Sequence, residues 1–592
     1  MPDKAKIRIG GASGFWGESD MAVPQFLEQG DLDYIVFDYL AEITLSIMAR
    51  ARAKNPEAGY ATDFVTAALK PNLKAIATQG VKIISNAGGV NPQACGEAVR
   101  ALIKEAGLDL KVTVVMGDDL KDRAADFAAQ TEMFSGEVFP PAEKIASINA
   151  YLGAFPIAEA LGRGADIVIT GRCVDSAVTL GACIHEFGWA RKDWDKLSAG
   201  SLAGHIIECG PQATGGNFTD WELVADSLVE AGYPIAEISA DGSIEITKPT
   251  GTGGLVSIGT VGEQMLYEIG DPQAYALPDV ICDFSAVKLE QVSADRVRMT
   301  GAKGYPAPET YKTSVTWADG FRAGTTFFFV GENASAKARQ FAKNALARAE
   351  AKLRRMNAPA YDETLVEVIG DGSAFGGAPV SASTDVAVKL AVKHVDARAA
   401  GLILREATGH ALAAPPGLSG FSGGRPKPSP VVRLFSMLVD KSAVQISLDL
   451  GGETIALDRE SGSTPPAIMR PEPPKTDAAA DTEVPLIRLA WSRSGDKGDK
   501  ANIGVLPRDP SFAPWIWSAL SEEVIRERFS HYLKGDVERF YMPGTGAMNI
   551  LLHDVLGGGG VASLRNDPQA KTYSQILLAM PIPVPNSIAE AL

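Results

Sequence analysis

The sequence predicts an α/β protein with an N-terminal parallel-sheet region, an α+β second region and a small C-terminal ferredoxin-like α+β domain. Three observations lead to this fold class. Residues 1–217 alternate short apolar runs with amphipathic stretches, residues 218–458 are dominated by short β-rich segments, and residues 459–483 are rich in proline, acidic and small residues. Because a chain of 592 residues is too long for one ordinary domain, we expect about two to four domains.

The first region has the rhythm of a parallel sheet with helices on its faces. Each apolar run ends in a polar or glycine-rich turn, as expected of buried parallel strands. Helices are predicted between them over 61–80 and 91–107; the second begins with Asn91 as a cap and Pro92 at its first position, and closes on Gly107. The predicted strands are IRIGG, DYIVFDY, VKIISNAGG, KVTVVMGDD and ADIVITGRCVDS.

The second region combines short strands with two stretches that we interpret as helical, at 333–355 and 383–399. The segment 459–483 is interpreted as a linker, since it cannot bury enough apolar surface to fold alone. Residues 484–592 then form a compact unit. It is predicted to run strand (LIRLAW), charged loop, strand (NIGVL), helix (515–533) and strand (VERFYMP).

The charge and composition exclude several classes of protein. A formal net charge of −16 argues against a nucleic-acid or anionic-membrane surface, because such surfaces are bound by clustered cations. No run of 18 apolar residues and no signal-peptide core is found, so we expect a cytoplasmic protein without a membrane partner. The cysteines are scattered without a paired motif, which is typical of reduced, buried thiols.

The turn SNAGGVNPQ follows a predicted strand and precedes a helix. Amides freed at Gly88 and Gly89 and by the first helical turn, flanked by Asn86 and Asn91, would make a cradle for an anion or a carbonyl group. A tight turn with an asparagine cap explains the same residues equally well. In DYLAE, Asp38 and Glu42 place two carboxylates at the second strand end, and one of them is expected to cap a helix.

The fifth strand end, TGRCVDSA, carries Arg172 and Asp175. The arginine could bind a carboxylate or a phosphate while the aspartate acts as acid or base, or the two could form a buried pair that holds the loop. Cys173 between them is a candidate nucleophile only if a base lies nearby.

In GHIIECGPQATGGN, His205 and Glu208 are three residues apart and could share one side of a helical turn. We regard them as the best acid/base pair in the chain. The alternative is a hydrogen-bonded core histidine. A second glycine-rich turn follows, formed by Gly215, Gly216 and Asn217.

The segment RSGDKGDKANIGV, residues 493–505, lacks the spacing of a phosphate-binding P-loop and continues as a strand. It is either a hairpin with solvated charges or a loop that the last domain presents to the core's site or to a subunit interface. In the second case Asp496, Lys497 and Asn502 would be its contacts. We find no metal-binding, dinucleotide or flavin fingerprint.

Taken in order, the strings GGASGFWGES, FDYLAE, SNAGGVNP, ITGRCVDSA and ECGPQATGGNF resemble the acyclic terpene utilisation (AtuA) family. The C-terminal SGDKGDKANIGV resembles the AtuA-like ferredoxin-fold domain, here fused to the core. The family is named for bacterial growth on citronellol and geraniol through branched acyl-CoA thioesters. The resemblance implies a role in acyl-CoA or branched carboxylic-acid catabolism, with residues 1–217 and 218–458 as two halves of the core.

We therefore expect a hydratase- or lyase-type enzyme acting on a branched or unsaturated acyl-CoA or a related acid. Glu208, His205 or Asp175 would move the proton, Arg172 would bind the anion, and the glycine-flanked amides would polarise the carbonyl. No cofactor is required beyond coenzyme A as part of the substrate, and a homo-oligomer is expected. The alternative is a non-catalytic acyl-CoA binding or scaffold subunit; a ligase or phosphotransferase is a weaker third hypothesis.

Overall fold

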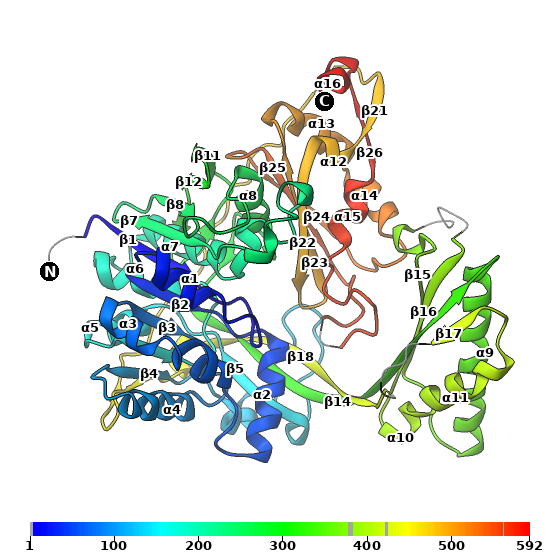
Figure 1. Cartoon of the computed structure of the whole chain (residues 1–592), viewed down its shortest axis with the longest axis horizontal. Helices are drawn as coiled ribbons and strands as arrows, with labels where there is room; N and C mark the ends of the chain where they lie inside the picture. The colour runs from blue at the N-terminus through cyan, green and yellow to red at the C-terminus, as the bar shows by residue number, and fades with distance from the viewer. Residues whose placement is uncertain (1–3, 377–382, 421–423, 425, 477, 561) are drawn as a thin grey trace.

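The computed structural model describes residues 4–376, 383–420, 424, 426–476, 478–560 and 562–592 (Figure 1). Its largest sheet has the strand order β11-β12-β8-β7-β1-β2-β3-β6-β4-β19-β20. All the apolar runs predicted for the first region form strands in the parallel centre of this sheet, which confirms the α/β fold class. These strands are β1 (Lys6–Gly11), β2 (Tyr34–Phe37), β3 (Lys82–Ser85), β4 (Val112–Met116) and β6 (Ile167–Thr170).

The parallel strands are buried on both faces, which explains their continuous apolar sequences. Ile84 and Val168 belong to the apolar cluster on one face, whereas Ile83 and Ile167 belong to the cluster on the other. This alternation is the two-residue period of a strand. Helices cover the two faces: α1 (Ala22–Gln29), α2 (Glu42–Lys54), α3 (Leu73–Gln79), α4 (Pro92–Glu105), α5 (Phe155–Gly162), α6 (Ala177–Phe187) and α7 (Trp194–Ile207).

Several strands that follow residue 217 extend this sheet. β7 (Ile235–Ser239) pairs antiparallel with β1, so the sheet continues across the expected boundary at 217. The later strands pair with edges that the parallel strands alone would leave open. The other antiparallel additions are β8 (Ile244–Thr247), β12 (Arg296–Thr300), β11 (Lys288–Ser293), β19 (Ser447–Asp449) and β20 (Thr454–Ala456).

The long strand β14 (Thr310–Val330) connects the core to a second layer (Figure 1). Its first half pairs with β5 (Ile145–Ala150) and β18 (Ser429–Asp440). Its second half pairs with β16 (Asp385–His394) and β17 (Leu418–Gly420). The helices α9 (Ala334–Arg355), α10 (Ala397–Ala400) and α11 (Leu402–His410) cover one face of this half, and β15 (Glu363–Ile369) extends it.

The helix predicted over 383–399 is therefore wrong for most of its length. Its sequence alternates Val386, Val388, Leu390 and Val392 with other residues, and these four pack in the core beneath α9. This two-residue period fits a strand, and pairing with both β14 and β15 outweighs the helix propensity of the alanines and lysines between them.

A small sheet and a helix lie beside the large sheet, next to the C-terminal domain. The helix α8 (Ile258–Leu266) begins at a capping box in which Ser257 and Thr260 satisfy each other's backbone amides. The small sheet comprises β9 (Tyr275–Ala276), β10 (Ile281–Asp283) and β13 (Lys303–Tyr305).

The last domain is the predicted ferredoxin-like sandwich, with the strand order β22-β23-β25-β24. The hairpin of β22 (Ala490–Lys497) and β23 (Lys500–Pro507) turns at Gly498, whose φ of 68° suits glycine. The remaining elements are β21 (Thr482–Pro485), α12 (Leu486–Leu489), α13 (Ala513–Ala519), α14 (Glu522–Arg528), β24 (Val537–Met542), β25 (Ala547–Leu552), α15 (Tyr573–Leu578), β26 (Pro581–Val584) and α16 (Asn586–Ala591).

Two predictions for this domain need correction. The segment LIRL, predicted as a strand, is the short helix α12, because both Leu486 and Leu489 pack into the domain core from one side of a helical turn. The helix predicted over 515–533 is divided into α13 and α14, since the Ser521 side chain accepts the Val524 amide and so starts a new helix.

The predicted linker has no regular secondary structure over its described residues up to 481, its last two residues begin β21, and it runs along the core. Glu460 is buried, with Arg191 at 3.1 Å and the Tyr311 hydroxyl at 2.5 Å. Farther along, Arg470 forms an ion pair with Asp271 at 2.5 Å. In the described part of the chain, no helix is long and apolar enough to cross a membrane.

Candidate functional site

The carboxyl ends of β2, β3 and β6 bring polar side chains together at one edge of the sheet. Asn86, after β3, donates to the Asp38 carboxylate at 2.5 Å and accepts the Tyr39 amide at 2.7 Å. Arg172, after β6, donates to Asp175 at 2.7 Å and to the Leu40 carbonyl at 2.9 Å. The ends of parallel strands meet at the same edge, where open α/β sheets bind their ligands.

Asp118 positions the turn that carries Arg172 and Asp175. Its carboxylate accepts the Arg172 amide at 2.8 Å and the Asn149 side chain at 2.9 Å. A Cβ atom at Gly171 would lie 2.3 Å from an oxygen of Asp118, so only glycine permits this approach. Burial raises the pKa of Asp118 to about 7.

His205 and Glu208 form a buried pair at the end of α7. The helix carries His205 in its last turn, and its Nδ1 atom lies 3.0 Å from Oε1 of Glu208. Nε2 of the imidazole is buried, and within the described residues it has no hydrogen-bond partner. Burial raises the pKa of Glu208 above its ordinary value; the neighbouring His205 opposes this shift and Asp175 adds to it.

Asp38 shares this environment. Burial raises the pKa of its carboxyl well above the ordinary value; Asp175 and Glu208 raise it further, whereas Arg172 lowers it. The edge therefore holds three interacting carboxyl groups, and charging all of them together is unfavourable. At least one of them is disposed to keep a proton near neutral pH.

The C-terminal domain adds a cation to these carboxyl groups. Burial alone would lower the pKa of Lys497, but Tyr275, Glu268, Asp175 and Glu208 raise it above its ordinary value. The ammonium group thus remains charged among these oxygens. We refer to Asp38, Arg172, Asp175, His205, Glu208 and Lys497 as the acid cluster.

The hairpin of residues 493–505 is held against the core by two of its own side chains. Arg493 donates to the Gly216 carbonyl at 3.1 Å and to the side chain of Gln212. Asn502 donates to the Leu266 carbonyl at 2.6 Å and accepts the Glu268 amide at 2.9 Å. Asn502 therefore lies in the junction between the domains.

The glycine turn after β3 does not leave its amides available to a ligand. The Gly88 amide donates to the Thr170 carbonyl at 3.1 Å, and the Gly89 amide donates to the Asn86 carbonyl at 3.2 Å. Asn91 caps α4 and ties its start to the Ala58 carbonyl at 2.9 Å. The tight-turn alternative describes these residues, and the expected cradle at this turn needs correction because backbone acceptors already fill it.

The second glycine turn serves the domain junction. The amides of Gly215 and Gly216 donate to the Pro211 carbonyl, while the Gly216 carbonyl accepts Arg493. The amides are therefore not free to polarise a carbonyl, which corrects the role expected for them. Asn217 is exposed, with a left-handed φ of 58°. Glu42 is the first residue of α2, and its side chain lies outside the described part of the structure.

Two other predicted residues lie at the border of the acid cluster. Cys173 is buried, and burial raises the pKa of its thiol to about 12, so it is a poor nucleophile. Asp496 lies 3.3 Å from the Gln569 amide and 3.7 Å from Lys571. It also lines a cleft between the domains.

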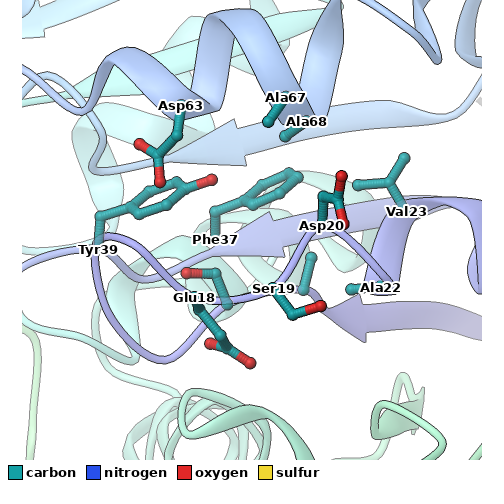
Figure 2. A pocket seen from close by; sticks show the side chains of 12 residues that line it. Glu18, Ser19, Asp20, Ala22, Val23, Phe37, Tyr39, Asp63, Ala67 and Ala68 are labelled. Carbon is teal, nitrogen blue, oxygen red and sulfur yellow. The ribbon is translucent and has the colours of Figure 1, made fainter. Parts of the chain in front are cut away.

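The loop after β1 encloses only a small cavity of about 30 Å³ (Figure 2). Figure 2 shows the side chains of Glu18, Tyr39 and Asp63 around it. Glu18 accepts the Gly14 amide at 2.6 Å and the Tyr233 hydroxyl at 2.7 Å. A cavity of this size holds about one water molecule, so this loop offers no room for a nucleotide.

Sequence reasoning placed Asp38 at the second strand end without giving it a role in the site, and it did not find Tyr275. Asp38 follows β2 directly, and its position at a strand end was a usable signal. Tyr275 lies in β9, and the centre of its ring is 6.5 Å from that of the His205 ring. No sequence pattern indicates this contact.

Comparison with known families identifies both parts of the chain. The family described as acyclic terpene utilisation family protein AtuA matches residues 7–450. The AtuA ferredoxin-like domain matches residues 484–583. No curated protein matches the chain. Because the first match covers well over half of the 592 residues, the protein belongs to the acyclic terpene utilisation (AtuA) family, with a ferredoxin-like domain fused to its core.

Proposed function

We propose that this protein is an enzyme that adds water to, or removes water from, a branched or unsaturated acyl-CoA thioester or a related carboxylic acid. Family membership associates the chain with acyclic terpene utilisation. The observation that carries the proposal is the acid cluster, in which the raised pKa values of Asp38 and Glu208 occur beside the half-buried, charged ammonium group of Lys497. Clusters of interacting groups with strongly perturbed pKa values are typical of sites of proton transfer.

In the dehydration direction, Glu208 takes the proton from the carbon next to the thioester carbonyl. His205 holds the Glu208 carboxylate in place at 3.0 Å. The negative charge that develops on the carbonyl oxygen is stabilised by the Lys497 ammonium group, which replaces the glycine amides expected in this role.

The leaving hydroxyl group departs from the next carbon with a proton from Asp38 or Asp175. The C–H and C–O bonds break, a C=C bond forms and water is released, so the step is balanced without a redox partner. Hydration follows the same path in reverse. A protonated carboxyl group near neutral pH is needed for this transfer, and burial favours that state for Asp38.

The test uses the purified protein with short branched enoyl-CoA esters, and follows loss of the conjugated thioester absorbance. We expect turnover by the native chain and a loss of about 100-fold or more in Glu208→Gln and Asp175→Asn, as is typical of an acid/base group. Glu97→Gln, on the exposed side of α4, is the matched control and should retain full turnover.

The alternative function is a non-catalytic acyl-CoA binding or scaffold subunit. It would be supported if CoA esters raise the melting temperature of the native chain and of both variants equally while no turnover is found. Stabilisation by ATP–Mg²⁺ alone, with no effect of CoA esters or free acids, would contradict both functions.

A further inference from the structure

A cleft of about 560 Å³ lies where the C-terminal domain faces the β14–β16 sheet. In Figure 1 the C-terminal domain stands between the α/β core and this sheet. One wall is formed by β14 and β16, the opposite wall by Gly560 and residues 563–569, and one end by the start of α2 and by Asp496. A volume of this size is within the range of small-molecule sites.

The wall of this cleft is the face of the sheet that α9 does not cover. Val388 and Leu390 point into the core beneath α9, so Lys389 and Ala391 point to the other side. Lys389 is paired in register with Thr326 of β14, which also lines the cleft. The alternation of β16 thus places a lysine on the open face.

The lining of the cleft is strongly basic in a chain with a net charge of −16. Arg322, Lys389, Lys427 and Arg565 all line it, and Asp496 is the acidic residue among the lining residues. The cations come from both walls, so an anion between them would meet positive charge on two sides. Such an arrangement suits phosphate groups, which bind several charge-assisted donors at once.

Two of these cations also contact the opposite wall of the cleft. Lys389 donates to the Arg565 carbonyl at 2.9 Å, and Arg322 donates to the Ser563 carbonyl at 3.3 Å. Burial lowers the pKa of Lys389, while the nearby Glu367 raises it and Arg322 lowers it. Glu367 accepts the Asn566 amide at 2.7 Å, and Lys427 is exposed. Glu363 also lies near Arg565, whose guanidinium group donates to the Val555 carbonyl and lies 4.9 Å from the centre of the Tyr532 ring.

Two chain segments connect this basic cleft to the acid cluster. Ala41 and Asp496 line the cleft. Their chain neighbours are Leu40, whose carbonyl accepts Arg172, and Lys497 of the acid cluster. Consecutive Cα atoms are about 3.8 Å apart, so the end of the cleft and the acid cluster are adjacent.

We propose that this basic cleft binds the phosphate groups of the coenzyme A part of the substrate, while the acyl part extends past Ala41 and Asp496 to the acid cluster. The proposal rests on the function proposed above, and adds where and by which residues the carrier is held. It explains why the C-terminal domain is part of the same chain, since that domain supplies one wall of the cleft and Lys497 of the acid cluster.

The test is calorimetric titration of the full-length protein with coenzyme A, 3′-dephospho-coenzyme A, pantetheine and ATP–Mg²⁺ at low and high salt. The variants are Lys427→Glu, which changes an exposed side chain, and Lys389→Gln. Lys389→Arg, which keeps the positive charge, is compared with Lys389→Gln. Lys343→Gln, exposed on α9, is the control. Circular dichroism and melting temperatures establish that each variant is folded.

We expect coenzyme A to bind more tightly than pantetheine, with an affinity that falls as salt is raised. Lys427→Glu and Lys389→Gln should each weaken coenzyme A binding about tenfold, the size of one hydrogen bond to a charged group. Lys389→Arg and Lys343→Gln should bind as the native chain does. Equal binding of coenzyme A and pantetheine, or unchanged affinity in both variants, would overturn the proposal, as would tighter binding of ATP–Mg²⁺.

The experiment separates this proposal from the proposed function. If the variants weaken coenzyme A binding but no thioester is turned over by the native chain, the cleft is assigned and the hydratase chemistry is wrong. If thioesters are turned over and KM is unchanged in Lys427→Glu and Lys389→Gln, the chemistry stands and the cleft assignment is wrong.

Discussion

The guanidinium group of Arg493 donates a hydrogen bond to the carbonyl oxygen of Gly216 at 3.1 Å, joining the C-terminal domain to the core. The same group lies 4.6 Å from the centre of the Tyr267 ring and also donates to Gln212. Arg493 is only 6% exposed, so its partners have little access to water. The contact fixes the strand that carries Lys497 four residues later.

We expect Arg493→Ala to lower the free energy of unfolding by about 2 to 3 kcal/mol, because buried acceptors lose a charged donor. Urea denaturation measures this effect. The control is Arg355→Ala, at the exposed end of α9, which should change the stability by less than about 0.5 kcal/mol. Equal effects of the two substitutions would show that the junction does not depend on Arg493.

Removing the ammonium group of Lys497 should destabilise the protein in a pH-dependent way. At pH 8 the carboxylate of Glu208, which is only 14% exposed, would remain without its cation, and we expect Lys497→Met to cost about 3 kcal/mol. At pH 5 protonation relieves part of this cost, since Lys497 lowers the pKa of Glu208 in the native protein. Denaturation at both pH values tests this.

Lys500→Met is the matched control, since Lys500 pairs with Lys497 across the hairpin. Its ammonium group lies over the Phe134 ring at 4.4 Å, and burial lowers its pKa despite the opposing effect of Glu538 and Glu132. The cost of Lys500→Met should be the same at pH 5 and pH 8. A pH-independent cost for Lys497→Met would mean that Lys497 does not interact with the acid cluster.

The buried carboxyl group of Glu263 in α8 should also make the stability of the protein depend on pH. It is 1% exposed, it accepts the Thr219 amide at 3.1 Å, and burial raises its pKa to about 7. Between its unfolded pKa of about 4.5 and about 7, the folded state holds the proton more tightly, so the free energy of unfolding falls as pH rises. Because glutamine does not ionise, Glu263→Gln should not show this fall, and at pH 8 its free energy of unfolding should exceed that of the native chain by up to about 3 kcal/mol.

The glutamine retains an acceptor for the Thr219 amide, so the variant and the native chain should have similar stability near pH 4.5. The control Glu97→Gln, at an exposed site on α4, should follow the native pH dependence. If Glu263→Gln has the same slope as the native chain from pH 5 to pH 8, the proposed protonation of Glu263 is wrong.

Gly11 permits the close approach of β1 to the end of α7. A Cβ atom at Gly11 would lie 2.2 Å from the carbonyl oxygen of Ile207, the residue before Glu208. We expect Gly11→Ala to cost about 3 kcal/mol, because the helix end must shift. Gly409→Ala in α11 is the control, since outside the helix's own backbone no atom of the described residues lies within 4 Å of its Cβ position.

This control should stabilise the protein by about 0.5 to 1 kcal/mol, the usual gain of alanine over glycine in a helix. Thermal unfolding of both variants measures the two effects with opposite signs. A Gly11→Ala protein as stable as the native chain would contradict the tight packing at this strand end.

The local sequence patterns predicted the parallel strands and the strand ends, because continuous apolar runs followed by polar turns directly report burial and chain reversal. These patterns were misleading where helix-forming residues and an alternating apolar pattern occur in the same segment, or where a segment is very short. Residues 385–394 contain good helix formers, yet their alternating valines pair with strands from both sides. Leu486 and Leu489 form a helical turn that is too short to be recognised by periodicity.

The sequence by itself determined the family, the α/β class and the identity of the chemically capable residues, since these depend on local composition and on the order of motifs along the chain. Only the tertiary structure decided which of them meet. Lys497 reaches Glu208, and Lys389 faces Arg565, across separations of 289 and 176 residues. Such contacts follow from the packing of whole domains, because long-range proximity is set by the burial of their apolar faces rather than by any local pattern.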